Sequence, residues 1–190
     1  MQYVYNYLFP AMWISYLVYW WTMSANIKSP VRTEATLSRL IRSILLIFAV
    51  VLIWLPRIPF LLLDLRFLPQ SDWCFWSGVI ITAGGLSFSI WARSLLGKNW
   101  SQAVTVKEDH QLITSGAYAL VRHPIYTGFI LGFVGSSVAL GECRGLIAVA
   151  FVFGVLLYKL RLEDKWLHDQ FGKSYEIYCQ RVSALIPFIL

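Results

Sequence analysis

The sequence predicts an all-α, polytopic integral membrane protein: a helical bundle of about five transmembrane helices with a cytoplasmic loop and a C-terminal interfacial helix. Of its 190 residues, 58% are hydrophobic and only 14% are charged, and the mean hydropathy is +0.61. A soluble domain of this size carries about 25% charged residues. Several apolar stretches approach the roughly 20 residues needed to cross a bilayer. We therefore expect one membrane domain over residues 1–190, with the lipid bilayer as its first partner.

Five apolar stretches mark the expected spans, at residues 3–23, 40–63, 73–92, 125–141 and 145–160. The first has no basic segment before it and no small-residue cleavage site after it, which indicates a retained span rather than a signal peptide. The second contains Pro56, Arg57 and Pro59. Because proline interrupts helices, this helix should end near Leu55 and the chain should continue along the membrane surface.

The fourth and fifth stretches are separated only by "ECR", which predicts a tight helical hairpin. Gly128 and Gly132 form a small-xxx-small pattern in the fourth stretch, and Ala150 and Gly154 form one in the fifth. Such patterns allow membrane helices to approach closely. We expect these two faces to pack against each other.

The basic residues predict the orientation. With five spans, all but three of the 16 Lys and Arg residues fall on one side, the exceptions being Arg57, Arg66 and Arg144. Since basic residues collect in cytoplasmic loops, the N-terminus is expected outside and the C-terminus in the cytoplasm. This bias accounts for the net charge of +6, so no nucleic-acid partner is expected.

The cysteines do not suggest a metal site. Cys74, Cys143 and Cys179 are far apart and lack the spacing of zinc ligands or of a disulfide framework. We therefore expect no metal.

Two cytoplasmic segments are too long to be simple connectors. Residues 93–124 are rich in apolar and aromatic side chains and should be folded. Residues 161–182 carry an apolar stripe and should form a helix on the membrane or on that loop; the stripe consists of Leu167, Phe171, Tyr175, Tyr178 and Val182. The domain thus divides into N-terminal helices, 1–92, and a functional half, 93–190.

The stretch "GAYALVRHPIYTG" places titratable groups where the fourth span begins. Pro124 suits the first turn of a helix, so His123 should lie near the cap. The free amides and partial positive charge of a helix N-terminus, together with Arg122, could hold a carboxylate. Tyr126 should point back over the same corner. Taken singly, Arg122 could equally be a headgroup anchor, Tyr126 an interfacial tyrosine and His123 a capping residue.

The stretch "YKLRLED" lies at the cytoplasmic end of the fifth span. Lys159 and Glu163 are four residues apart and therefore share a helix face, with Asp164 beside them. They form either an interfacial salt bridge with a snorkelling lysine or an acid and a base that hold a zwitterionic ligand. We call Arg122 and His123, at the start of the fourth span, the Arg-His corner. Because the hairpin is short, this group and the Arg-His corner should form one pocket.

Two passages, "EDHQLITSGAYALVRHPIYTG" and "RLEDKWLHDQFGKSYEIYCQRVSALIPFI", resemble the isoprenylcysteine carboxyl methyltransferase family. The resemblance covers about residues 91–189, and the wider superfamily includes phospholipid N-methyltransferases. It implies an S-adenosylmethionine pocket formed by the loop and the C-terminal helix, lined by His110, Gln111, Leu112, Ile113, Tyr118, His123, Pro124, Ile125, Tyr126 and Glu163.

The resemblance also implies roles for charged residues. Glu163 matches the acid that holds the cofactor ammonium group, and Lys159 stands where the family has a substrate-facing arginine. Lysine keeps the charge but lacks the bidentate fork of arginine. Asp164 replaces the usual glutamate. Arg122 is expected to bind substrate with Lys159 and, with Tyr126 and Glu163, to position the reactants, and no dedicated catalytic base is expected.

The expected function is S-adenosylmethionine-dependent methylation of an isoprenylcysteine-like carboxylate, a lipophilic acceptor that is ionised at neutral pH and needs no strong base. The first alternative is a phosphatidylethanolamine-type N-methyltransferase, in which an acid or histidine must accept a proton. A membrane reductase of the related group would need a nicotinamide cofactor instead. A small transporter is a further alternative, suggested by the Pro56 to Pro59 segment.

Overall fold

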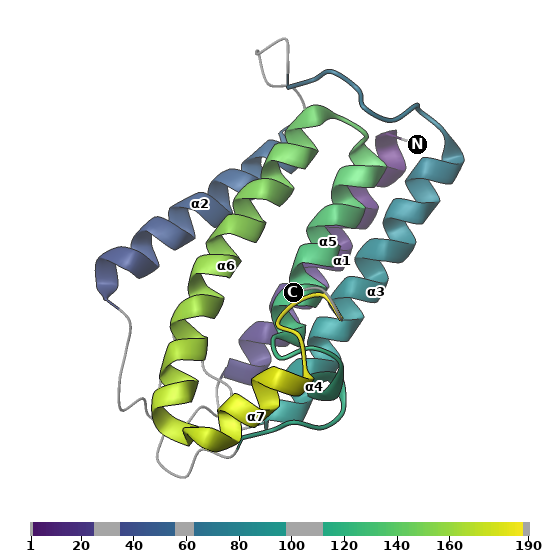
Figure 1. The fold of residues 1–190 in the computed structure, drawn as a ribbon. Helices are drawn as coiled ribbons and strands as arrows, with labels where there is room; N and C mark the ends of the chain where they lie inside the picture. Colours follow the sequence, from purple (N-terminus) through teal and green to yellow (C-terminus); the bar gives the residue numbers. More distant parts are fainter. Residues whose placement is uncertain (1, 25–34, 56–62, 98–111, 188–190) are drawn as a thin grey trace.

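The described part of the chain forms five long helices and two short ones in the computed structural model (Figure 1). The structure describes residues 2–24, 35–55, 63–97 and 112–187. No strand is present in these ranges, so the predicted all-α membrane bundle is confirmed. The helices in chain order are α1 (Gln2–Ser24), α2 (Thr36–Trp54), α3 (Asp72–Leu96), α4 (Ala117–Leu120), α5 (Pro124–Leu140), α6 (Cys143–Phe171) and α7 (Lys173–Arg181).

The five long helices overlap the five expected spans in sequence, and three of them have the length and apolarity of a membrane span. α2, α3 and α6 are long and apolar enough to cross a membrane, and α5 is a shorter apolar helix of 17 residues. α1 has 23 residues and no charged side chain, but it is rich in tyrosine and tryptophan and less hydropathic than those three. α2 ends at Trp54, as expected from the prolines that follow. The predicted surface segment from Pro56 to Pro59 lies outside the described residues.

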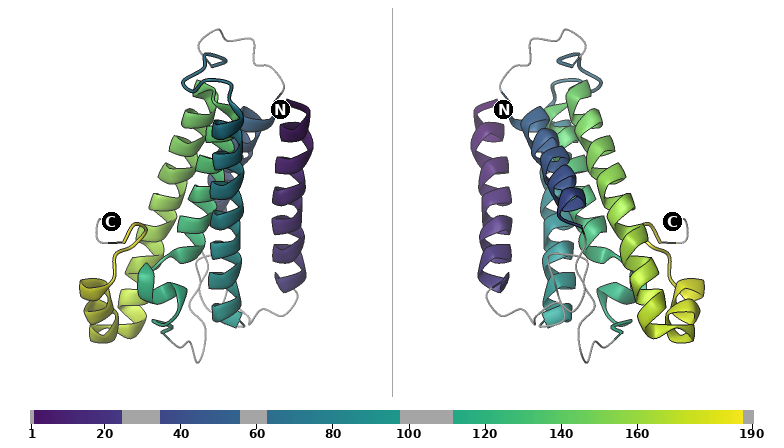
Figure 2. Two further views of the ribbon diagram at one scale, coloured as in Figure 1. Left: turned by 90° about the vertical axis from the view of Figure 1, so that its right-hand side faces the viewer. Right: turned by 90° about the vertical axis from the view of Figure 1, so that its left-hand side faces the viewer.

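Successive long helices run in opposite directions (Figure 1), and α4 and α7 lie together at the end of the bundle where α3 and α6 finish (Figure 2). Arg93, Arg122 and Lys159 belong to this end, whereas Arg66 and Arg144 belong to the other. The two ends therefore differ in charge as the sequence predicts. Which end faces the cytoplasm stays a prediction from that difference.

The predicted boundary after the fifth span is wrong. A span at 145–160 and a separate helix at 161–182 were expected from the sequence, but α6 continues without interruption to Phe171. The sequence between residues 160 and 171 contains no helix-breaking residue. Charged residues are compatible with a helix, so α6 can continue beyond the membrane. The chain turns at Gly172, whose φ of +51° suits glycine, and α7 follows. Glu163 and Asp164 are thereby rigidly placed on the transmembrane helix itself.

The predicted partner of the α5 glycines is also wrong. Gly128 packs against α3 rather than α6, and a Cβ added at Gly154 would meet no atom of the described residues within 4 Å. A Cβ at Gly78 would lie 2.6 Å from the carbonyl oxygen of Gly135, and a Cβ at Gly85 would lie 2.7 Å from that of Gly128. The seven-residue spacing is the same on both helices, so their backbones touch at two levels. This contact fixes α5, which carries the Arg-His corner at its start.

Hydrogen bonds within the bundle attach α1 to these two helices. The Tyr16 hydroxyl lies 2.9 Å from Ser89 Oγ of α3. Trp13 Nε1 donates to Ser136 Oγ of α5 at 3.1 Å. At the helix ends, the buried Arg93 donates to the carbonyl oxygens of Met23 and Gly97, at 2.8 and 2.9 Å. Polar side chains thus join helices where the hydrophobic effect between lipid-exposed surfaces is weak.

Candidate functional site

The Arg-His corner forms at the start of α5, as predicted. Pro124 is the first residue of the helix and His123 is its N-cap. Two backbone amides just before the helix are used within the protein, whereas the anion site predicted at the helix N-terminus itself stays a prediction. The amides of Arg122 and His123 donate to the carbonyl oxygens of Ser183 and Ala184, at 2.8 and 2.9 Å. Side chains, rather than these amides, are what the corner presents to a ligand.

The segment that follows α7 runs along this corner. Besides the two amide bonds, Thr127 Oγ1 donates to the Leu185 carbonyl oxygen at 2.8 Å, and Arg122 Nη1 donates to that of Val182 at 2.6 Å. Ala184 and Leu185 are buried and pack beside Leu160 of α6. Residues 182–185 therefore join the start of α5 to α6 near Leu160.

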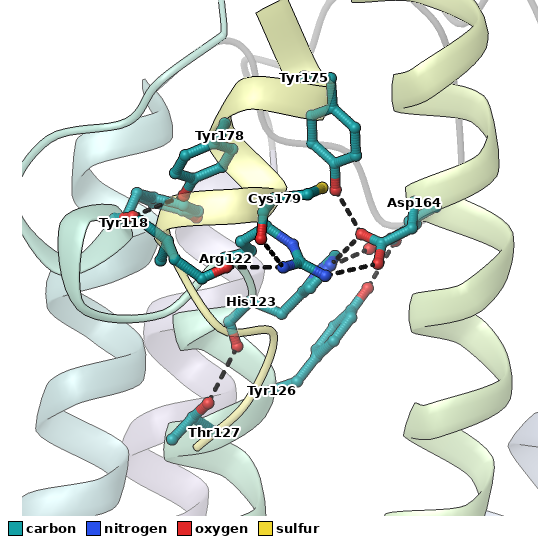
Figure 3. Close-up of polar contacts among 11 residues, drawn as sticks. Tyr118, Arg122, His123, Tyr126, Thr127, Asp164, Tyr175, Tyr178 and Cys179 are labelled. Atoms are coloured by element: carbon teal, nitrogen blue, oxygen red, sulfur yellow. Dashed lines mark hydrogen bonds and ion pairs between the residues drawn. The ribbon is translucent and has the colours of Figure 1, made fainter. Parts of the chain in front are cut away.

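Asp164 contacts three donor side chains from two parts of the fold, the corner before α5 and α7 (Figure 3). Arg122 Nη2 donates to Asp164 Oδ2 at 3.1 Å, and His123 Nε2 lies 2.7 Å from Oδ1. The Tyr175 hydroxyl, from α7, also donates to Oδ1. Burial and the neighbouring carboxylate raise the pKa of Tyr175 well above its ordinary value, so the phenol remains a donor. Burial alone would lower the pKa of Arg122, but Asp164 raises it overall.

Glu163 faces a different set of groups. The Tyr126 hydroxyl donates to Glu163 Oε1 at 2.5 Å, and Lys159 Nζ lies 3.6 Å from the same oxygen. Glu163 Oε2 lies 3.7 Å from His123 Nδ1. The His123 and Tyr126 rings are stacked, with centroids 5.5 Å apart and planes 3° from parallel. Lys159 Nζ lies 5.1 Å from the centre of the Tyr126 ring, within the range of a cation–π contact.

These side chains form one connected line. In space the order is Arg122, Asp164, His123, Glu163 and Lys159, so each carboxylate lies between two basic groups. Adjacent acids on one helix would otherwise repel each other. The predicted meeting of the Arg-His corner with the α6 charges is thus present, and it includes direct contacts.

The remaining predicted site residues lie around this line. Tyr118 is buried on α4, and its carbonyl oxygen accepts a hydrogen bond from the Tyr178 hydroxyl at 2.5 Å. Ile113 and Ile125 pack against the Tyr118 cluster, and Leu112 is partly buried. His110 and Gln111 lie outside the described residues.

Three features of the site were missed from the sequence. Tyr175 was taken only as part of an apolar stripe, whereas its hydroxyl reaches Asp164. Thr127 and residues 183–185 were given no role, and Val182 was taken only as the end of that stripe. The tyrosines of "YEIY" were a usable signal, because a buried tyrosine normally finds a partner for its hydroxyl.

Comparisons with known proteins follow the same half of the chain. The family model described as "Phospholipid methyltransferase" matches residues 73–174, just over half of the chain. Protein-S-isoprenylcysteine O-methyltransferase B of Arabidopsis thaliana is 34% identical over 98 residues, which are 49% of each chain. The Schizosaccharomyces pombe protein-S-isoprenylcysteine O-methyltransferase is 36% identical over 100 residues, covering 49% of this chain and 41% of the relative.

Two further similarities extend over more of the chain. The cobalt-zinc-cadmium resistance protein CzcN of Cupriavidus metallidurans is 31% identical over 140 residues, 71% of this chain and 62% of the relative. The solved structure of a eukaryotic intramembrane Ras methyltransferase, isoprenylcysteine carboxyl methyltransferase, aligns with a TM-score of 0.54 and 22% identity. That alignment covers 84% of this chain and 55% of the other, and it shows a shared fold. The chain spans about half the length of the first two relatives.

Proposed function

The chain belongs to the phospholipid methyltransferase family, and from that premise we propose that it is a membrane-embedded methyltransferase that uses S-adenosylmethionine. The observation that carries the proposal is the setting of Glu163. This carboxylate stands at the edge of the Arg-His corner, with a side chain 21% exposed, beside Tyr126 and His123. A partly exposed carboxylate among aromatic rings suits a ligand that carries an ammonium group and an apolar, cationic centre.

The chemistry of the predicted residues supports this cofactor. Glu163 would hold the ammonium group, and His123 and Tyr126 would provide the adjoining aromatic wall. Leu112, Ile113, Pro124, Ile125 and Tyr118, with His110 and Gln111, would complete the pocket. When bound, S-adenosylmethionine supplies a methyl group made electrophilic by a positive sulfur.

We propose an isoprenylcysteine-like carboxylate as the methyl acceptor. Lys159 is the cation that would face such a carboxylate, because it lies one helical turn from Glu163 on the same face of α6, over the Tyr126 ring. Arg122 is already engaged with Asp164 and with two carbonyl oxygens. Its part in substrate binding would therefore be to position the site rather than to hold the acceptor. The relatives whose names specify a carboxyl acceptor support this substrate class.

Methylation of a carboxylate requires no proton transfer by the protein. An ionised carboxylate attacks without a base, so the side chains act by orienting the two reactants and excluding water. The carboxyl oxygen–methyl bond forms while the methyl–sulfur bond breaks, and no proton moves. Every carboxylate and basic group at the corner already has a partner, which agrees with a site built for orientation.

A phospholipid amine is the second candidate acceptor, and the family description favours it. An amine must lose a proton, and Glu163 is the carboxylate placed to receive it. The products separate the two: methyl label released by mild alkali marks an ester, and label retained in lipid marks an amine.

The membrane setting completes the proposal. The chain is an integral membrane protein by its apolar helices and its relatives. We place the N-terminus outside, and α4, α7 and the site at the cytoplasmic surface, because the basic residues gather there. A lipophilic acceptor would then enter from the bilayer and the cofactor from the cytosol.

The proposal is tested by titrating the detergent-solubilised protein with S-adenosylhomocysteine in a calorimeter. Wild type is expected to bind at micromolar concentration, and Glu163→Ala and His123→Ala each to bind at least about tenfold more weakly, as for loss of a charged hydrogen bond. His168→Ala and Glu176→Ala are matched controls, because both side chains are exposed at the same end of the bundle. Absence of binding by folded wild type would refute the proposal.

A further inference from the structure

Glu163 and Asp164 are adjacent on α6 but contact different groups. We infer that Asp164 is a positioning residue that sets the His123 ring and fastens α7, whereas Glu163 is the acid that meets the ligand. This inference rests on the proposed function, since it concerns how the same site is held in shape.

Asp164 is occupied on both oxygens. Oδ1 lies 2.7 Å from His123 Nε2 and also accepts from the Tyr175 hydroxyl, and Oδ2 accepts from Arg122 at 3.1 Å. The three donors come from the corner before α5 and from α7. The side chains of Asp164 and Glu163 are similarly exposed, at 23% and 21%, so the two acids differ in their contacts rather than in their exposure. A ligand ammonium group could reach Asp164 only by displacing one of them.

Glu163 is held more loosely. The Tyr126 hydroxyl donates a hydrogen bond to Oε1 at 2.5 Å. Lys159 at 3.6 Å and His123 Nδ1 at 3.7 Å are ion-pair neighbours beyond hydrogen-bond distance. Among the described residues Oε2 accepts no hydrogen bond, so we infer that it receives the donor that a ligand brings.

Asp164 acts on the proposed ligand site through His123, whose ring forms the aromatic wall of that site together with Tyr126. The contact of Asp164 with Nε2 orients the imidazole ring so that the other ring nitrogen, Nδ1, points toward Glu163. The same contact fixes the plane of the ring, which is stacked on Tyr126. A carboxylate behind a histidine commonly sets ring orientation in this way, without touching the ligand.

Asp164 also anchors α7. That helix has two buried tyrosines, and their hydroxyls go to different places: Tyr175 to Asp164 and Tyr178 to the Tyr118 carbonyl oxygen. The pair offers a matched comparison, because both residues lie on one face of one helix and Tyr178→Phe leaves Asp164 untouched.

The test compares two ligands, S-adenosylhomocysteine and its analogue that lacks the amino group, by calorimetry on the full chain in detergent. Glu163→Gln is expected to weaken S-adenosylhomocysteine about tenfold and to leave the desamino analogue nearly unchanged. Asp164→Asn is expected to weaken both ligands by a similar factor, and Asp164→Glu, which restores the charge, to recover most of the loss. If Asp164→Asn affected only the ligand with the amino group, Asp164 would be a direct ligand contact and the inference would be wrong.

A second measurement needs no ligand. Unfolding midpoints of Asp164→Asn, Tyr175→Phe and the double variant should be non-additive, whereas Asp164→Asn with Tyr178→Phe should be additive. Additivity in the Tyr175 pair would overturn the anchoring part of the inference. Failure of wild type to bind either ligand would instead refute the proposed function, while these midpoints would still decide whether Asp164 anchors α7.

Discussion

The contact between α3 and α5 yields a prediction with an internal control, because Gly84 and Gly85 are neighbours in very different surroundings. A Cβ at Gly85 would lie 2.7 Å from the Gly128 carbonyl oxygen and 2.8 Å from the Gly132 nitrogen. Both are backbone atoms, so no side chain can move aside and the helices must separate. A Cβ at Gly84 would meet nothing within 4 Å in the part of the chain that the structure describes.

The magnitudes follow from these two surroundings. Replacing a helical glycine by alanine stabilises by about 0.5–1 kcal/mol. Overpacking a tight interface costs about 1–3 kcal/mol or more. Gly84→Ala should therefore be neutral or slightly stabilising, and Gly85→Ala should be destabilising. The two variants are expected to differ by about 1–3 kcal/mol in the free energy of unfolding.

The assay is reversible unfolding in mixed detergent micelles, followed by circular dichroism, with both alanine variants and wild type in one series. Because α5 also carries the Arg-His corner, Gly85→Ala should weaken S-adenosylhomocysteine binding at temperatures where it is still folded. Equal stability of the two variants would refute the backbone contact, and with it the reasoning that α3 sets the position of the corner.

Three other predictions test separate parts of the structure. Burial raises the pKa of Cys179, so its thiolate fraction near neutral pH is small; alkylation should be slow there and accelerate as the pH rises, and fast alkylation at neutral pH would contradict this. Lys159→Met should reduce turnover of a carboxylate acceptor about tenfold or more with little change in S-adenosylhomocysteine affinity, whereas the exposed Lys165→Met serves as a control with unchanged turnover. Arg93→Gln removes donors to the Met23 and Gly97 carbonyl oxygens and should lower the free energy of unfolding by about 1–3 kcal/mol. The assay is the one used for the glycine variants, and an unchanged free energy of unfolding would show that these two hydrogen bonds do not stabilise the fold.

Local features of the sequence were sufficient to predict the start of the site. Pro124 determines where α5 begins, and a short hairpin necessarily returns α6 to the same end of the bundle. That His123 shares one end of the bundle with Glu163 and Asp164 could therefore be predicted from the sequence, whereas their direct contacts could not.

The partners of each helix could not be predicted in the same way. Gly128 and Gly154 carry the same pattern, but only the three-dimensional arrangement decides that Gly128 meets Gly85 on α3. The extent of α6 was missed because a change from apolar to charged residues marks the edge of a membrane, which is not the end of a helix. Tyr175 was missed because the spacing of a tyrosine predicts where its ring lies but not what its hydroxyl reaches.

The backbone pairing of residues 122–123 with 183–184 has a consequence for biosynthesis. The two segments of this contact are separated by the whole α5–α6 hairpin and by α7, so a ribosome makes the second segment only after all five long helices have been synthesised. Until then the corner lacks its partners on the C-terminal side, and Arg122 has neither the Val182 nor the Cys179 carbonyl oxygen to donate to. The corner can therefore reach its final geometry only after the whole α5–α6 hairpin and α7 have been synthesised.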